Sequence, residues 1–100
     1  MTDFGLSEEI IAKIKQVFKN YSKIEKAKVF GSRAKGNYRE NSDIDIVVWG
    51  NLDLQEIGQI VLDLDELPTS YSFDLKLYSE INHPKLKSHI ERVAKNFYAK

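Results

Sequence analysis

Two aspartates separated by a single residue are the strongest sign of chemistry in this chain. Asp43 and Asp45 begin a run rich in β-branched residues, where aspartate is disfavoured. Because side chains alternate along a strand, both carboxylates project from the same face, roughly 6–7 Å apart. Such carboxylates repel each other unless a cation lies between them, and Mg²⁺ prefers oxygen ligands. The pair predicts a magnesium site; the alternative is two solvated residues at the start of a strand.

A third carboxylate, Asp74, lies on the polar face of another expected strand. If that strand pairs beside the strand of Asp43 and Asp45, the three carboxylates converge. Three acidic groups can hold two metal ions, one at the attacking oxygen and one at the leaving phosphates of a group transfer. The alternative for Asp74 is a single strand aspartate that faces water.

A turn of small residues precedes the acidic pair. Gly31 and Ser32 directly follow an expected strand. Glycine lets the backbone approach a phosphate closely, and serine adds a hydroxyl donor. If Ser32 begins a short helix through Arg33 and Ala34, the first N–H groups of that helix face an anion. The turn and the acidic pair together predict a site that transfers a nucleotide.

Two more residues of this segment are candidate nucleotide ligands. Arg33 can neutralise phosphate, or alternatively pair with Glu40. Ser42 either caps the entry to the strand or supports the carboxylates. Lys35 and Arg39 are expected on a solvated face.

These groups need a sheet to position them. In chain order, the patterns predict a helix capped by Ser7, strands at 26–30 and 43–49, a helix capped by Asp53, a strand at 71–78 and a helix capped by Asn82 that runs to residue 98. The apolar stripes of the last two helices are expected at Leu54, Ile57, Val61 and Leu64, and at Leu86, Ile90, Val93, Ala94 and Phe97. The predicted fold class is α/β (α+β), a small mixed sheet with helices packed on it.

Composition limits the function further. Residues 1–100 suit one domain, and 15 basic residues balance 15 acidic ones. Nucleic-acid binding is disfavoured, because such domains usually carry a basic excess. No stretch reaches the ~20 apolar residues that span a bilayer, and residues 1–4 lack the pattern of a secretory signal. The absence of cysteine excludes disulfides and suits a reducing cytoplasm.

The run Gly31-Ser32-Arg33-Ala34-Lys35-Gly36, followed by Ser42-Asp43-Ile44-Asp45-Ile46, resembles the signature of the polymerase-beta-like nucleotidyltransferase superfamily. It is most similar to that of the minimal nucleotidyltransferases of bacteria and archaea. The resemblance implies that Gly31 and Ser32 bind the phosphates of a nucleoside triphosphate, with ATP as the expected substrate. It also implies that Asp43 and Asp45 ligate two Mg²⁺ ions. Asp74 would be the third carboxylate, which helps to deprotonate the incoming hydroxyl.

The resemblance further implies a protein partner. Minimal members are typically paired with a small helical HEPN-type protein, often a ribonuclease toxin. In such pairs the nucleotidyltransferase acts as an antitoxin, which binds the toxin and transfers AMP from ATP to one of its tyrosines. The alternative is a binding module of the same fold that neutralises its partner without catalysis. Homo-oligomers are left open.

The remaining candidates have structural explanations. His83 and His89 do not share a helix face at metal-ligand spacing. Tyr38 either stacks on a base or covers the polar loop. Tyr71, Tyr78 and Tyr98 are expected either at a partner surface or at the edge of the core.

Overall fold

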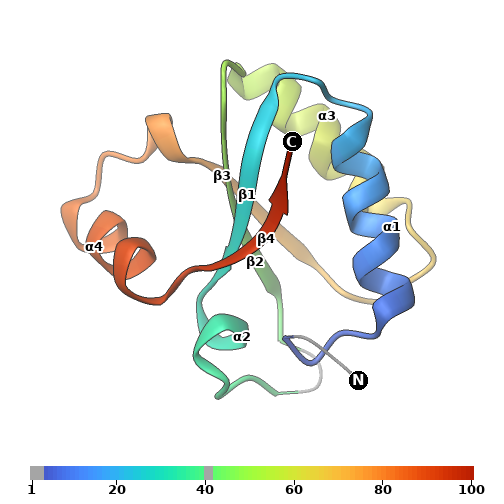
Figure 1. The fold of residues 1–100 in the computed structure, drawn as a ribbon, viewed down its shortest axis with the longest axis horizontal. Helices are drawn as coiled ribbons and strands as arrows, with labels where there is room; N and C mark the ends of the chain where they lie inside the picture. Colours follow the sequence, from blue (N-terminus) through green and yellow to red (C-terminus); the bar gives the residue numbers. More distant parts are fainter. Residues whose placement is uncertain (1–3, 40–41) are drawn as a thin grey trace.

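The chain forms a four-stranded mixed sheet with helices on both faces (Figure 1). A computed structural model describes residues 4–39 and 42–100. The strands are β1 (Ile24–Phe30), β2 (Ile44–Gly50), β3 (Phe73–Leu77) and β4 (Lys95–Ala99). The helices are α1 (Glu8–Lys19), α2 (Ser32–Lys35), α3 (Leu54–Asp65) and α4 (Pro84–Val93), with a 3₁₀ turn, η1 (Tyr78–Glu80). The predicted α+β class and mixed sheet are confirmed.

The strand order β3-β2-β1-β4 places the acidic strands side by side. β1 pairs antiparallel with both β2 and β4, whereas β2 and β3 are parallel. A parallel pair needs a crossover connection, and α3 supplies it. The crossover therefore brings a residue from the second half of the chain next to the β2 carboxylates.

Two apolar clusters cover the two faces of the sheet. On β2, Ile44, Ile46 and Val48 belong to the larger cluster, which includes buried residues of α1 and α3. Val47 points to the opposite face and packs with Ile90 of α4. In Figure 1, α1 and α3 accordingly lie on one side of the sheet and α4 on the other. The alternation predicted for residues 43–49 is confirmed.

The predicted starts of the first two long helices are also confirmed. The Ser7 side chain accepts a hydrogen bond from the Ile10 N–H at 3.2 Å. Asp53 accepts one from the Glu56 N–H at 2.8 Å, while Glu56 accepts one from the Asp53 N–H at 3.2 Å. This reciprocal capping box sets the point where α3 leaves β2. None of the described helices has the length and apolar character that spanning a bilayer requires.

The end of the chain differs from the prediction. A helix to residue 98 was expected, but α4 ends at Val93 and Ala94 adopts an extended conformation. Residues 95–99 instead form β4, which pairs with β1. Phe97 is buried in the larger cluster as a strand residue, and a helical apolar stripe also predicts its burial, so its apolar character did not distinguish helix from strand. The strand satisfies backbone groups of β1 that would otherwise form an open edge.

Two details of the other helices also need correction. His83, not Asn82, occupies the cap position of α4, and its side chain makes no capping hydrogen bond. Leu54 does not face the core, because it is 64% exposed at the first position of α3. The buried residues of α3 are Ile57, Ile60 and Leu64. The inner stripe therefore begins at Ile57 and includes Ile60, which the predicted stripe omitted.

Candidate active site

Three carboxylates gather near the starts of β2 and β3. Asp45 pairs directly with Asp74 across the two parallel strands, so both side chains lie on the same face of the sheet. Asp43 immediately precedes β2. Asp43 and Asp74 are exposed, whereas Asp45 is half-buried between them and the sheet. The predicted pairing of the Asp74 strand beside the acidic pair is confirmed.

The charges of Asp43 and Asp74 act on the pKa of Asp45. Burial raises the pKa of Asp45, and the charges of Asp74 and then Asp43 raise it further. Lys76 and Arg33 oppose the shift without cancelling it. A half-buried carboxylate beside two like charges is an environment that a divalent cation would relieve.

Gly31 brings the small-residue turn into contact with Asp45. Phe30, the last residue of β1, pairs with Asp45, so the chain turns directly beside this carboxylate. Gly31 has a φ of 73° and a ψ of −154°, a conformation that residues with a side chain rarely adopt. A Cβ atom at Gly31 would overlap Oδ2 of Asp45 and lie 3.2 Å from its Cγ. Glycine is therefore required for both the backbone conformation and the close approach.

The predicted short helix after Gly31 is present as α2, which begins at Ser32. Its N-cap residue, Gly31, has no side chain to cap the first turn, and an uncapped helix start favours an anionic group. Ser32 is partly exposed at this position and directly follows Gly31, which approaches the Asp45 carboxylate. Turn, helix start and carboxylates thus face one region, which suits a phosphate chain with its metal ions.

Arg33 has a role that the sequence did not reveal. Its side chain is only 2% exposed and lies between the rings of Tyr38 and Tyr71, about 5 Å from each centroid. Its Nε and Nη2 donate to the Ser42 carbonyl at 3.2 and 2.9 Å, and its Nη1 donates to the Phe4 carbonyl at 2.8 Å. Arg33 therefore ties α2 to the segment that enters β2. No local pattern signals this role, because its partners come from distant segments.

Ser42 supports the same segment. Its hydroxyl accepts a hydrogen bond from the Arg39 N–H at 2.7 Å, and its own N–H donates to the Arg39 carbonyl at 3.0 Å. Ser42 thereby ties Arg39 to the position immediately before Asp43. The alternative partner of Arg33, Glu40, lies outside the described residues. Nucleotide contacts by Arg33 and Ser42 stay predictions.

Comparison with known proteins shows the family to which this chain belongs. The sequence profile of the family described as "Polymerase beta, Nucleotidyltransferase" matches residues 12–100. The chain belongs to this family. Its matched region contains Gly31, Ser32 and all three carboxylates. Among curated proteins, no sequence is significantly similar to this chain.

Solved structures of a candidate minimal nucleotidyltransferase and of toxin-antitoxin complexes contain chains of the same fold. A toxin-antitoxin complex with AMP-PNP contains a chain 25% identical, with a TM-score of 0.73, over 95% of this chain and 75% of that chain. A candidate minimal nucleotidyltransferase is 26% identical, with a TM-score of 0.68, over 94% and 95% of the two chains. A complex of the tri-AMPylated Shewanella oneidensis HEPN toxin with its MNT antitoxin matches at 19% identity and a TM-score of 0.71, over 95% and 74%. This last likeness shows the fold alone.

The carboxylates of this site would supply only part of the coordination of Mg²⁺. Among residues 4–39 and 42–100, no group of three His, Cys, Asp or Glu side chains is assembled to hold a metal ion. Mg²⁺ usually takes one or two carboxylates and completes its coordination with water and substrate phosphates. Asp43, Asp45 and Asp74 fit that use, because Asp45 and Asp74 share one face of the sheet beside the Gly31 turn and Asp43 directly precedes β2.

Lys76 also belongs to this face, as the predicted alternation of residues 71–78 indicated. Its Nζ lies 3.7 Å from Oδ1 of Asp74, and the two side chains are 38% and 48% exposed. An ion pair this exposed contributes little to stability. It does place a partly exposed cation next to the carboxylate at the edge of the sheet.

The other candidate residues have packing roles. His89 contacts Phe30 edge-on, with ring centroids 6.4 Å apart, and His83 occupies the N-cap position of α4. Tyr78 stacks on Trp49 and donates its hydroxyl to Glu91 at 3.0 Å, which raises the pKa of the tyrosine. The remaining tyrosines pack against side chains of the fold: Tyr38 and Tyr71 against Arg33, and Tyr98 against Phe18.

Proposed function

We propose that this chain is a Mg²⁺-dependent nucleotidyltransferase that transfers AMP from ATP to a tyrosine hydroxyl of a HEPN-type partner. In this role it acts as the antitoxin of that partner. The observation that carries the proposal is the pairing of Asp45 with Asp74 beside the Gly31 turn. A binding surface has no need of a half-buried carboxylate next to two others, because their mutual repulsion disfavours the ionised form.

The comparisons support the choice of nucleotide and partner. The family is one of nucleotidyltransferases, and the antitoxin complex at 25% identity contains AMP-PNP. In the Shewanella oneidensis complex, a tri-AMPylated HEPN toxin is bound to an MNT antitoxin, and the complex contains a chain of the same fold as this one. These names motivate the assignment of ATP, of a HEPN-type acceptor and of the antitoxin role.

The chemistry divides between alignment and charge neutralisation. The acceptor oxygen attacks the α-phosphorus, a new P–O bond forms, and the bond from that phosphorus to the pyrophosphate oxygen breaks. The phenol proton passes to Asp74, the carboxylate on the edge strand. Gly31 and Ser32 hold the phosphates in line for the displacement. Mg²⁺ held by Asp43, Asp45 and Asp74 would supply neutralisation of charge on the attacking and leaving oxygens.

The direct test is transfer of α-labelled AMP to the product of the adjacent reading frame, the expected HEPN protein, with and without Mg²⁺. We expect wild type to label the partner and Asp45→Asn to lose at least about 100-fold in rate, because the variant lacks a carboxylate that would hold Mg²⁺, the cation that neutralises charge in the transition state. Asp65→Asn is the matched control, since Asp65 is an exposed aspartate at the end of α3. Its rate should equal that of wild type.

The opposite results are equally clear. Full transfer by Asp45→Asn would show that the carboxylates do not carry the reaction. No label from any triphosphate, together with neutralisation of the partner by an Asp43→Asn/Asp45→Asn double variant, would identify a binding module instead.

A further inference from the structure

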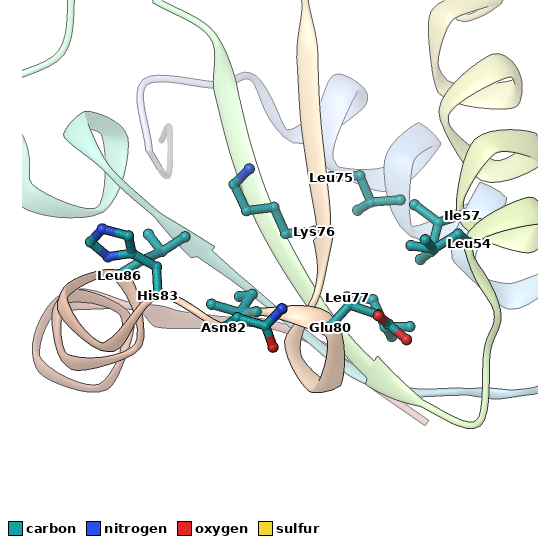
Figure 2. Close-up of a pocket in the computed structure, with 10 residues that line it drawn as sticks. Leu54, Ile57, Leu75, Lys76, Leu77, Glu80, Asn82, His83 and Leu86 are labelled. Atoms are coloured by element: carbon teal, nitrogen blue, oxygen red, sulfur yellow. The ribbon is translucent and has the colours of Figure 1, made fainter.

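A groove lies along the outer edge of β3, next to the carboxylates (Figure 2). Its volume is about 280 Å³. One wall comes from Leu54 and Ile57 of α3, and the other from His83 and Leu86 at the start of α4. Figure 2 shows Leu75 directed toward the α3 wall and Lys76 on the side of α4. The groove therefore has the edge strand as its floor.

The floor of the groove offers backbone hydrogen-bonding groups. The Ser72 carbonyl accepts a hydrogen bond from the Ile44 N–H at 2.9 Å, so this residue faces β2. Because strand residues alternate, Asp74 and Lys76 also direct their N–H and C=O groups toward β2. Leu75 and Leu77 direct theirs outward. Within the described chain the sheet ends at β3, so no strand pairs with that side.

The α3 wall is unusually apolar for a surface. Leu54 is 64% exposed at the first position of α3, although the capping box fixes the helix there. It lies above the buried Ile57 and Leu75, so apolar surface continues from the helix to the edge strand. An unpaired strand edge beside apolar surface is the arrangement that binds an extended peptide by strand addition.

We infer that the groove binds the acceptor protein as an added β-strand, in a register that places its hydroxyl residue opposite Asp74. This inference rests on the proposed function. Neighbouring strands lie ~4.8 Å apart, and directly paired residues share a face of the sheet. A residue opposite Asp74 therefore projects its side chain onto the carboxylate face. The residue opposite Leu75 projects to the other face, against Leu54 and Ile57.

The register defines the chemistry of the acceptor segment. It has a hydroxyl residue, then an apolar residue at the neighbouring position that contacts Leu54. The residue two positions from the hydroxyl lies opposite Lys76 and shares its face, which favours an acidic side chain there. Lys76 can turn from Asp74 to such a group, because their ion pair is 3.7 Å long and half exposed.

Two exposed leucines of α3 allow a matched test. Leu54 lines the groove, whereas Leu62, 58% exposed, does not. We expect Leu54→Asp to weaken the complex with the HEPN protein of the adjacent reading frame at least about tenfold, a typical loss at a buried contact. KM for that protein should rise with it. Leu62→Asp should match wild type, and both variants should bind Mg²⁺ and AMP-PNP normally.

Amide hydrogen exchange tests the added strand itself. In the complex, the Leu75 and Leu77 amides should become protected, while the Asp74 and Lys76 amides are already protected in the free protein by β2. The inference would be overturned if Leu54→Asp and Leu62→Asp weakened binding of the HEPN protein equally. It would also be overturned if amide exchange at Leu75 and Leu77 stayed unchanged in the complex. Weaker AMP-PNP binding by Leu54→Asp alone would also overturn it and assign the groove to the nucleotide.

The binding and exchange measurements test this inference separately from the proposed function, which AMP transfer tests. A wild-type chain that binds the HEPN protein and transfers no label refutes the proposed transferase, and the Leu54 and exchange results still decide how the partner docks. Transfer with equal Leu54 and Leu62 variants refutes the groove alone. A chain that neither binds nor labels the HEPN protein refutes both.

Discussion

Replacing Gly31 by alanine separates the positioning of Asp45 from its chemistry. The added Cβ atom would overlap Oδ2 of Asp45, and the carboxylate must move by about 1 Å to reach normal contact. A displacement of that size at a reacting centre costs about 100-fold in rate. The backbone adds its own penalty, because the φ of 73° and ψ of −154° lie in a region used almost only by glycine, at about 1–3 kcal/mol.

Gly36 provides the control for the backbone penalty. It ends α2 with a φ of 88° and a ψ of 2°, and a Cβ atom there would meet nothing within 4 Å. Gly36→Ala should therefore lose about 1–2 kcal/mol of unfolding free energy from the left-handed backbone alone. Its transfer rate should stay near that of wild type, because no carboxylate is displaced.

The assay compares initial rates of AMP transfer to the HEPN partner with unfolding free energies from urea titration. Rates are measured where both variants are fully folded. We expect both variants to be destabilised and only Gly31→Ala to lose transfer. Equal loss of transfer in the two variants would attribute the effect to stability, and full activity of Gly31→Ala would refute the positional role of the turn.

Three further predictions concern stability, each measured by urea unfolding. Asp45→Asn should stabilise the Mg²⁺-free protein: because burial and then Asp74 raise the Asp45 pKa above 3.8, its ionised form disfavours folding. The gain in unfolding free energy should be absent below pH 3.8, grow between pH 3.8 and the raised pKa, and stay constant above it. A gain in unfolding free energy that grows toward acid pH would contradict this. Phe97→Ala should cost about 3–5 kcal/mol, since Phe97 anchors β4 in the core; a loss under 1 kcal/mol would place this residue outside the core. Arg33→Lys should cost about 1–3 kcal/mol despite its retained charge, because lysine cannot reproduce the paired bonds to one carbonyl; wild-type stability would refute the role of that fork.

Much of the site could be predicted because its signals are local. The alternation of residues 43–49 placed Asp45 on the face opposite Ile44 and Ile46, as the two apolar clusters confirm. The capping box at Asp53 is also a short-range pattern, with both partners inside one helical turn. Such features depend on residues within a few positions of one another, so the sequence alone reveals them.

The C-terminal strand could not be predicted for a physical reason. Ile90, Val93 and Phe97 satisfy a helical stripe, and burial of Phe97 is equally compatible with a strand. What decides between them is the edge of β1, which has unpaired backbone groups unless residues 95–99 cover it. That requirement becomes visible only after the strand order is known.

Arg33 shows the same limit within the site. Its fork to the Ser42 carbonyl and its bond to the Phe4 carbonyl join three segments, and its flanking rings come from Tyr38 and Tyr71. The charge of Arg33 predicts a phosphate contact, which stays a prediction, whereas its support of Ser42 at the entry to β2 becomes visible only in the structure. A buried arginine with carbonyl partners is held in place on both sides, so it can keep the turn and the carboxylates in fixed relation. The separation between Gly31 and Asp45, and with it the geometry available to a phosphate chain, thus depends on a residue that need not touch the substrate.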